Sequence, residues 1–178
     1  LSIGNLSSLL WLHLNNNCLE GKLPLTLKNL KQLRILDLGE NKFFGGIPSW
    51  TNITFPTLQI LRLRDNIFDG NIPSNLCKIK SLQILDLANN SLNGSIPHCI
   101  GNITRMTMDS AHTNQTIEQA FNSTPFGLRA GWRHQDVKQV MKGREFDYIK
   151  ILKLVVNLDF SNNNLAGPIP LELLSLVG

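Results

Sequence analysis

A short motif of leucine and asparagine recurs along the chain, and this repetition limits the possible folds more than any other feature. The pattern Leu-x-Leu-x-x-Asn, with phenylalanine as the second apolar residue of the last copy, begins at Leu12, Leu36, Leu61, Leu85 and Leu158. The first three steps between copies are 24, 25 and 24 residues, measured between Asn17, Asn41, Asn66 and Asn90. Each motif leads to a glycine and then to a Leu-Pro or Ile-Pro pair. Such a period predicts a stack of similar turns rather than packing around one centre.

The residue types of the unit fit a short parallel strand followed by a return turn. Side chains alternate along a strand, so the two leucines of Leu-x-Leu point into the core and the x positions face outward. The asparagine amide can satisfy backbone groups of neighbouring turns. Glycine allows a backbone conformation that other residues rarely adopt, and proline fixes φ at the start of an irregular or 3₁₀ return. Apolar residues then repack the core, as at Leu27, Leu30, Leu76 and Ile79.

The chain contains 31 Leu and 20 Asn, roughly double the usual share of each. We therefore assign most of them to structure rather than to a site. The full form, Leu-x-x-Leu-x-Leu-x-x-Asn-x-Leu-x-Gly-x-Ile-Pro, resembles the plant-specific, extracellular class of leucine-rich repeats over residues 1–106 and 148–178. The resemblance implies an α/β solenoid with a parallel sheet on its concave face, 3₁₀ or irregular outer turns, and often a second sheet near the Gly-x-Ile-Pro segment. Members form receptor ectodomains and inhibitors of wall enzymes.

One long insertion interrupts the repeats. The step from Asn90 to Asn163 is 73 residues, where one repeat needs 24, and the pattern holds to Met106 and resumes by Ile149. A long surface loop costs little closure entropy, so a spacer is one interpretation. Structureless loops of this length are uncommon unless they are functional or disordered, and we favour a functional one. The predicted parts are repeats in 1–106, an island insertion in 107–147 and a resumed repeat in 148–178.

Further motifs resemble the receptor-like proteins of plant immunity, which carry such an island a few repeats from the membrane. They are the segments Ile72–Cys77 and Ile96–Asn102, and Lys142–Tyr148 leading into Leu158-Asp159-Phe160-Ser161. In that family the island and the concave face bind an elicitor, and the repeats just after the island contact a co-receptor kinase with a short repeat ectodomain. The family often has tyrosine where this chain has Arg133, a departure that bears on the details of the island.

Cysteines and glycosylation motifs both indicate the secretory pathway. Cys77 and Cys99 lie 22 residues apart, close to one repeat, so a disulfide between adjacent turns is expected in a secreted protein. Cys18 has no obvious partner and is expected to be a packed or half-exposed thiol. The motif Asn-x-Ser/Thr occurs seven times, where about two would arise by chance, at Asn5, Asn52, Asn89, Asn93, Asn102, Asn114 and Asn122. We expect glycans and a location on the extracellular face of the plasma membrane.

Outward strand positions form columns across successive turns. One column carries Trp11 and three isoleucines, the next alternates charges from His13 through Arg62, and the third contains Arg64. Such a face suits a protein or peptide. The aspartates at positions 37, 86 and 159 are attributed to the repeat consensus. Candidate ligand-binding residues are Trp11, His13, Arg62 and Arg64, joined in the island by Phe126, Trp132, Arg133 and His134.

Other functions find little support in the sequence. The net charge is +4 without a continuous basic stripe carrying stacking aromatics, so nucleic acid is not an expected partner. The histidines and cysteines lack metal-ligand spacing, no cofactor motif occurs, and no nucleophile elbow or phosphate loop is present, so we expect no enzyme activity. No run of eighteen apolar residues occurs, and any membrane anchor is expected in a segment outside this sequence. The lack of capping repeats suggests a piece of a longer solenoid.

The interpretation is therefore extracellular ligand recognition by a plant receptor-like protein, sensing an elicitor or peptide and signalling through a co-receptor kinase. Two alternatives remain open. One is a defence protein like the polygalacturonase inhibitors, which binds a microbial wall enzyme but lacks an island. The other is the ectodomain of a hormone receptor kinase, a class that also uses islands.

Overall fold

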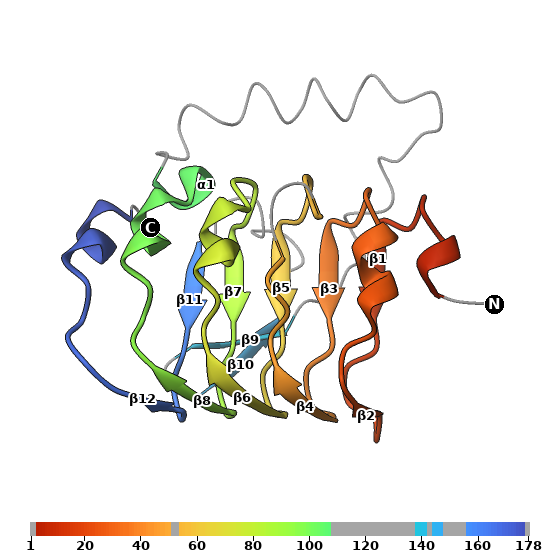
Figure 1. Ribbon diagram of the computed structural model, residues 1–178, viewed down its shortest axis with the longest axis horizontal. Helices are drawn as coiled ribbons and strands as arrows, with labels where there is room; N and C mark the ends of the chain where they lie inside the picture. The colour runs from red at the N-terminus through yellow and green to blue at the C-terminus, as the bar shows by residue number, and fades with distance from the viewer. Residues whose placement is uncertain (1–2, 51–53, 108–137, 142–143, 148–155, 177–178) are drawn as a thin grey trace. The chain divides into compact units, whose positions relative to one another are not determined.

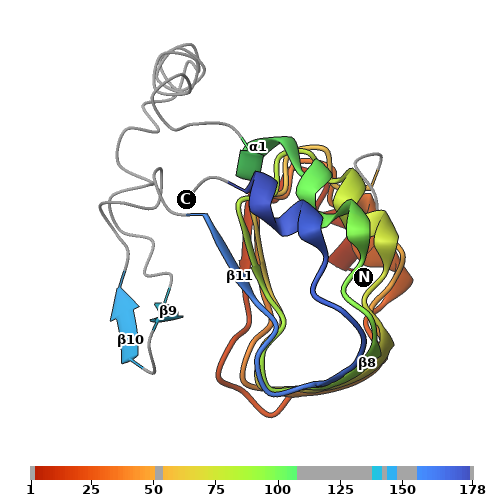
Figure 2. The same ribbon diagram turned by 90° about the vertical axis from the view of Figure 1, so that its left-hand side faces the viewer.

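The structure is a computed structural model, and it describes residues 3–50, 54–107, 138–141, 144–147 and 156–176. The chain divides into two compact units, Leu1–Thr107 together with Val156–Gly178, and Met108–Val155. The first unit is a solenoid whose turns stand side by side (Figure 1) and superpose when viewed along the stack (Figure 2).

Five short parallel strands form the main sheet, in the spatial order β1-β3-β5-β7-β11 (Figure 1). Their bounds are β1 Trp11–His13, β3 Ile35–Asp37, β5 Ile60–Arg62, β7 Ile84–Asp86 and β11 Asn157–Asp159. Each strand comes from one copy of the repeat, and equivalent residues pair in register. Strand β11 pairs directly with β7 although the second unit lies between them in sequence, so the repeat resumes where it stopped.

A second parallel sheet follows the asparagine of each turn, in the order β12-β8-β6-β4-β2. Its strands are β2 Glu20–Gly21, β4 Lys42–Gly46, β6 Ile67–Asn71, β8 Ser91–Gly94 and β12 Asn164–Leu165. The repeated glycines have φ between 72° and 101°, a region that side chains with a Cβ rarely adopt. This confirms the role predicted for glycine in the unit.

The outer side of the stack is made of 3₁₀ turns, on the side away from the main sheet (Figure 2). Four of them, η2 Leu25–Asn29, η3 Ser74–Lys78, η4 His98–Asn102 and η7 Leu171–Ser175, each begin directly after a proline. These prolines have φ between −68° and −61°, the value their ring favours. Two further elements are η1 Ile3–Asn5 and the short helix α1 Thr104–Thr107. The predicted solenoid, with its parallel sheet and 3₁₀ returns, is confirmed.

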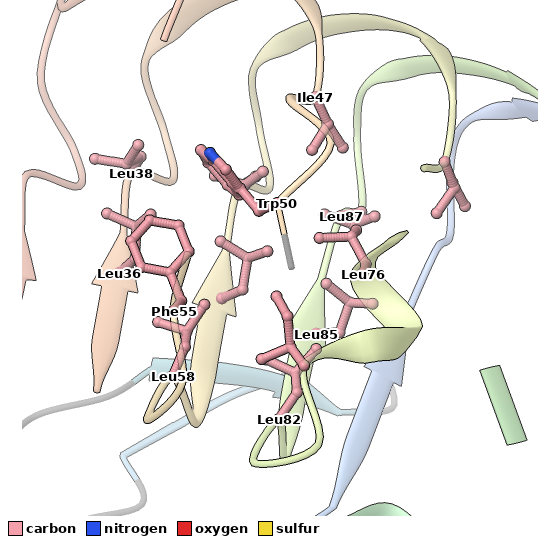
Figure 3. Packing of buried hydrophobic residues seen from close by; sticks show 14 of the residues in the cluster. Leu36, Leu38, Ile47, Trp50, Phe55, Leu58, Leu76, Leu82, Leu85 and Leu87 are labelled. Atoms are coloured by element: carbon pink, nitrogen blue, oxygen red, sulfur yellow. The ribbon is translucent and has the colours of Figure 1, made fainter. Parts of the chain in front are cut away.

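The core is a continuous row of apolar side chains between the sheets and the 3₁₀ turns (Figure 3). Leu27, Leu30, Leu76 and Ile79 are buried in it, as expected from their positions after proline. Aromatic pairs fill two wider places. Trp50 meets Phe55 edge to face with ring centroids 5.2 Å apart, and Phe43 stacks on Phe68 at 6.4 Å beneath the second sheet.

The repeated asparagines hold neighbouring turns together as a ladder. Asn66 donates from Nδ2 to the carbonyl oxygens of Leu38, Leu63 and Arg64, and its Oδ1 accepts from the amide of Phe43. Asn41, Asn90 and Asn163 each make the same four types of bond. The side chain thus satisfies backbone groups of its own turn and of the preceding one, which confirms its predicted structural role.

In the second unit the structure describes two strands, β9 Lys138–Met141 and β10 Arg144–Asp147, which pair antiparallel. Apart from Thr107 and these strands, the predicted island 107–147 lies outside the described residues.

Candidate ligand-binding site

The outward positions of the main sheet line up in columns that cross the turns. The second column runs through His13, Asp37, Arg62, Asp86 and Asp159 in register. The outward residues of the first column on the three central strands are absent from the core cluster, which confirms that side chains alternate between the two faces. These three isoleucines, Ile35, Ile60 and Ile84, are nevertheless buried. In the other two columns, Arg62, Arg64, Asp37 and Asp86 are buried as well. These outward positions therefore do not present open side chains, and the arginines and aspartates among them lie against one another along the sheet.

The aspartates of this column cap their own strands. Asp37 accepts from the backbone amide of Gly39 at 3.1 Å, and Asp86 does the same with Ala88 at 3.2 Å. Asp159 repeats the bond with the amide of Ser161. A side chain that satisfies the backbone two residues ahead is a local structural device. This supports the assignment of the three aspartates to the repeat.

Arg62 takes the place of the aspartate in its turn and joins the two neighbouring ones. Its Nη1 lies 3.2 Å from Oδ2 of Asp37, and its Nε lies 3.7 Å from Oδ2 of Asp86. Its Nη2 also bonds Glu40 Oε1 at 2.9 Å. The side chain is 1% exposed, so the guanidinium group is enclosed among three carboxylates.

Arg64 forms a second bridge beside the first. It donates from Nε to Asp65 at 2.8 Å and from Nη1 to Asp86 at 3.2 Å. Burial alone would lower the pKa of Arg64, but the hydrogen bond to Asp65 and the charge of Asp86 outweigh it and raise the pKa. Burial also raises the pKa of Asp86, against the opposite effect of the charge on Arg64. Both arginines thus have partners within the solenoid.

Two of these partners, Glu40 and Asp65, were not expected from the sequence. They occupy the position directly before the ladder asparagine, where the backbone has φ near 50° in every turn. Asparagine is among the few non-glycine residues that tolerate this conformation and fills the position in the other three turns, at Asn16, Asn89 and Asn162. The signal was therefore present: Glu40 and Asp65 depart from asparagine in the two turns nearest the arginines.

The candidates on β1 lie apart from the arginines, with strand β3 between them. Trp11 and His13 are half-buried. The indole Nε1 of Trp11 is buried without a hydrogen-bond partner. The remaining ligand candidates, Phe126, Trp132, Arg133 and His134, lie outside the described residues.

Cysteines and sequons can be placed in part. The Sγ atoms of Cys77 and Cys99 are bonded between η3 and η4, with Cα atoms 5.8 Å apart, whereas Cys18 is exposed and unpaired. Asn5, Asn93 and Asn102 are exposed and Asn89 is half-buried, while Asn52, Asn114 and Asn122 lie outside the described residues.

Two kinds of site find no candidates in the described part of the chain. Its His, Cys, Asp and Glu residues form no group of three that could hold a metal ion. None of its helices is long and apolar enough to cross a membrane.

The sequence matches the family model of the leucine-rich repeat five times, at residues 8–30, 32–52, 57–79, 81–103 and 155–176. The chain belongs to the leucine-rich repeat family. This family is defined by a structural repeat and not by a catalytic motif. The matched segments leave out the predicted island.

Relatives with this repeat are plant receptors. The chain is 34% identical over 169 residues to receptor-like protein 33 of Arabidopsis thaliana. The aligned region covers 95% of this chain and 16% of the relative. It thus spans about one sixth of that relative's length. The BIR3–SERK2 complex from Arabidopsis thaliana is similar in structure, with a TM-score of 0.61, 26% identity, and coverage of 91% of this chain and 60% of that one.

A second similar structure is the Arabidopsis receptor kinase HAESA in complex with the peptide hormone IDA and the co-receptor SERK1. Its TM-score is 0.54 and its identity 34%, over 56% of this chain and 17% of that one. The resemblance to plant leucine-rich repeat receptors inferred from the sequence is therefore confirmed.

Proposed function

We propose that this chain belongs to the extracellular ligand-recognition region of a plant cell-surface receptor-like protein. The 34% identity to receptor-like protein 33, across 95% of this chain, carries the proposal. The ligand is an extracellular protein or peptide, such as a pathogen elicitor. Passage through the secretory pathway agrees with the seven sequons and with the disulfide between Cys77 and Cys99.

The proposed partners are drawn by analogy from the similar receptor HAESA, which is solved with a peptide hormone and the co-receptor SERK1. By analogy, the repeat after the island, with strand β11 and turn η7, contacts a co-receptor kinase with a short repeat ectodomain. Asp159 is half-buried there and accepts from Ser161, and Ser161 and Asn162 just after β11 are exposed, so this part of the repeat presents a polar surface.

Ligand contacts are assigned first to the island residues Phe126, Trp132, Arg133 and His134, together with Trp11 and His13 on β1. A ligand reaches Arg62 or Arg64 only by replacing one of their carboxylate partners. An acidic ligand group could make that exchange, so the two arginines remain candidates for a later step of binding.

A second candidate is the ectodomain of a hormone receptor kinase, which the 34% identity to HAESA favours. Both candidate functions bind an extracellular ligand with the repeats, and they differ in the part of the protein that would follow the repeats. A kinase domain encoded after the repeats supports the second candidate, and a membrane span with a short tail supports the first.

Binding can be tested with defined probes. The chain is secreted from plant cells, immobilised, and exposed to a display library of random peptides, and the enriched peptides are then measured against a variant lacking residues 107–147. We expect peptide families that bind the intact chain and not the deletion variant. A purified SERK1 ectodomain should bind the intact chain more tightly when such a peptide is present, as measured by interferometry.

Matched variants separate recognition from folding. Trp132→Ala and His13→Ala should weaken peptide binding, whereas Lys28→Ala, an exposed change on the outer turn η2, should not. All variants must keep the thermal midpoint of the intact chain. Equal affinity of a folded deletion variant would exclude the island from the site. Absence of any enriched peptide would contradict peptide recognition itself.

A further inference from the structure

Four of the seven sequons lie in the described residues, and their asparagines have different surroundings. Asn5, Asn93 and Asn102 are exposed, while Asn89 is half-buried on the stack. We infer that Asn5, Asn93 and Asn102 carry N-linked glycans, and that Asn89 stays unmodified because its amide joins three successive turns. The sequence motif alone treats the four as equivalent.

The amide of Asn89 is used on both sides. Its Nδ2 donates to Oδ1 of Asp65 at 2.5 Å, on the preceding turn of the solenoid. Its Oδ1 accepts from Nδ2 of Asn162 at 2.9 Å, on the following turn. The residue also has φ of 53°, the conformation required before each ladder asparagine. Asn89 is therefore the middle member of a hydrogen-bonded row.

Glycosylation is incompatible with this row. The oligosaccharide comes from a lipid-linked diphosphate donor; the sugar C1–O bond breaks, a C1–Nδ2 bond forms, Nδ2 loses a proton and the lipid diphosphate leaves. Neighbouring strands lie about 4.8 Å apart, less than the room a sugar ring needs between two turns. A glycan on Asn89 thus breaks the bond to Asp65 or separates the turns. The turns on either side of Asn89 can therefore stack in this way only in chains whose Asn89 is unmodified.

The side chains of the other three asparagines differ from Asn89 in being exposed and in bridging no turns. Asn93 lies on β8 of the second sheet, and Asn102 and Asn5 end the 3₁₀ turns η4 and η1. Their side-chain amides make no hydrogen bond within the described part of the chain, and all three are exposed. None of them belongs to the main sheet, so these glycans leave the strands with the candidate binding residues uncovered.

Changes at the hydroxyl residue of each sequon test the inference without touching the asparagine. Ser91→Ala removes the sequon of Asn89, and Ser95→Ala, Thr104→Ala and Ser7→Ala remove those of Asn93, Asn102 and Asn5. The complete chain is passed through the secretory pathway of plant cells and its intact mass is measured. We expect one glycan fewer in each of the last three variants and no change in Ser91→Ala.

A stability measurement separates the two roles of the Asn89 position. Asn89→Ala removes both bonds of the row and should lower the thermal midpoint by about 2–8 °C, while Ser91→Ala should leave it unchanged. A glycan found on Asn89 of the secreted protein, or an unchanged midpoint in Asn89→Ala, would overturn the assignment of that residue. Bare Asn5, Asn93 or Asn102 in glycopeptide mapping would overturn the assignment of the other three.

Discussion

Replacing Arg62 by methionine gives a direct test of whether its guanidinium belongs to the solenoid or is available to a ligand. Methionine keeps much of the aliphatic stem and removes the charge. The described ion pairs give Asp37 no cation other than Arg62, and its side chain is 3% exposed. Asp86 keeps Arg64 at 3.2 Å, so the change leaves the buried carboxylate of Asp37 uncompensated. Breaking a buried pair in this way typically costs about 3–5 kcal/mol.

Protonation sets an upper limit to this cost. A carboxyl group with an ordinary pKa near 3.9 can take up a proton at pH 7 for about 4 kcal/mol, because each pH unit corresponds to roughly 1.4 kcal/mol. We expect a loss of about 3–4 kcal/mol at pH 7.

Urea unfolding followed by tryptophan fluorescence at pH 7 measures this loss, with the native disulfide present in the variant and in the wild type. The double variant Arg62→Met/Asp37→Asn should recover most of the stability at pH 7, because the asparagine oxygen can still accept from the amide of Gly39. A loss below about 1 kcal/mol at pH 7 would refute the reasoning. The guanidinium would then be free to serve as a primary ligand contact.

Three further changes test the frame of the solenoid. Asn66→Ala removes four hydrogen bonds and should lower the free energy of unfolding, measured with urea, by about 2–4 kcal/mol. The control Asn17→Ala removes two hydrogen bonds of an exposed amide and should lower it by less than about 1 kcal/mol. The double variant Cys77→Ser/Cys99→Ser removes a disulfide that links residues 22 positions apart, and its free energy of unfolding should fall by about 3 kcal/mol. Adding a reductant should lower the thermal midpoint of the wild type but not that of the variant. Burial raises the pKa of Asp86, so the contribution of this carboxyl group to stability is lost as pH rises through its folded pKa. The variant Asp86→Asn should therefore lose less stability than the wild type between about pH 4 and pH 7, as measured by unfolding at a series of pH values. Parallel curves of stability against pH for the two proteins would contradict this.

Much of the fold could be predicted because the repeat fixes register. Once Leu36, Leu61 and Leu85 are aligned, adjacent strands must pair residue by residue, and the ladder asparagine falls on the same bend in each turn. Proline and glycine then mark where the return begins and where φ must be positive. These are local constraints repeated at fixed spacing, which a single sequence displays fully.

The state of the candidate site could not be predicted in the same way. Register places Arg62 in the column of Asp37 and Asp86, but it does not show whether a long side chain lies along the sheet or stands away from it. Here the arginine lies along the sheet and is buried. Glu40 lies at the bend before the ladder asparagine and not at an outward strand position, so the columns of the strands do not include it. The relevant signal was a missing asparagine, which becomes meaningful only beside an arginine on the next turn.

Arg62 stands at the position where three other turns have an aspartate. It makes contacts between turns in place of the hydrogen bond that those aspartates accept from the backbone of their own turn. Asp37, Asp86 and Asp159 each cap their own strand, and Arg62 has no carboxylate for that role. It instead bridges Asp37 on β3 and Asp86 on β7, and therefore spans two interfaces between turns at once. The stability of a solenoid is approximately a sum of repeat terms and nearest-neighbour interface terms, so a side chain that spans two interfaces makes three turns unfold together. Arg64 extends the same link from Asp65 to Asp86. The arginines thus link the turns in the middle of the main sheet, between β1 and the turn that contains β11. Under the function proposed above, these links would fix the spacing between the proposed ligand contacts on β1 and the proposed co-receptor contacts beside β11.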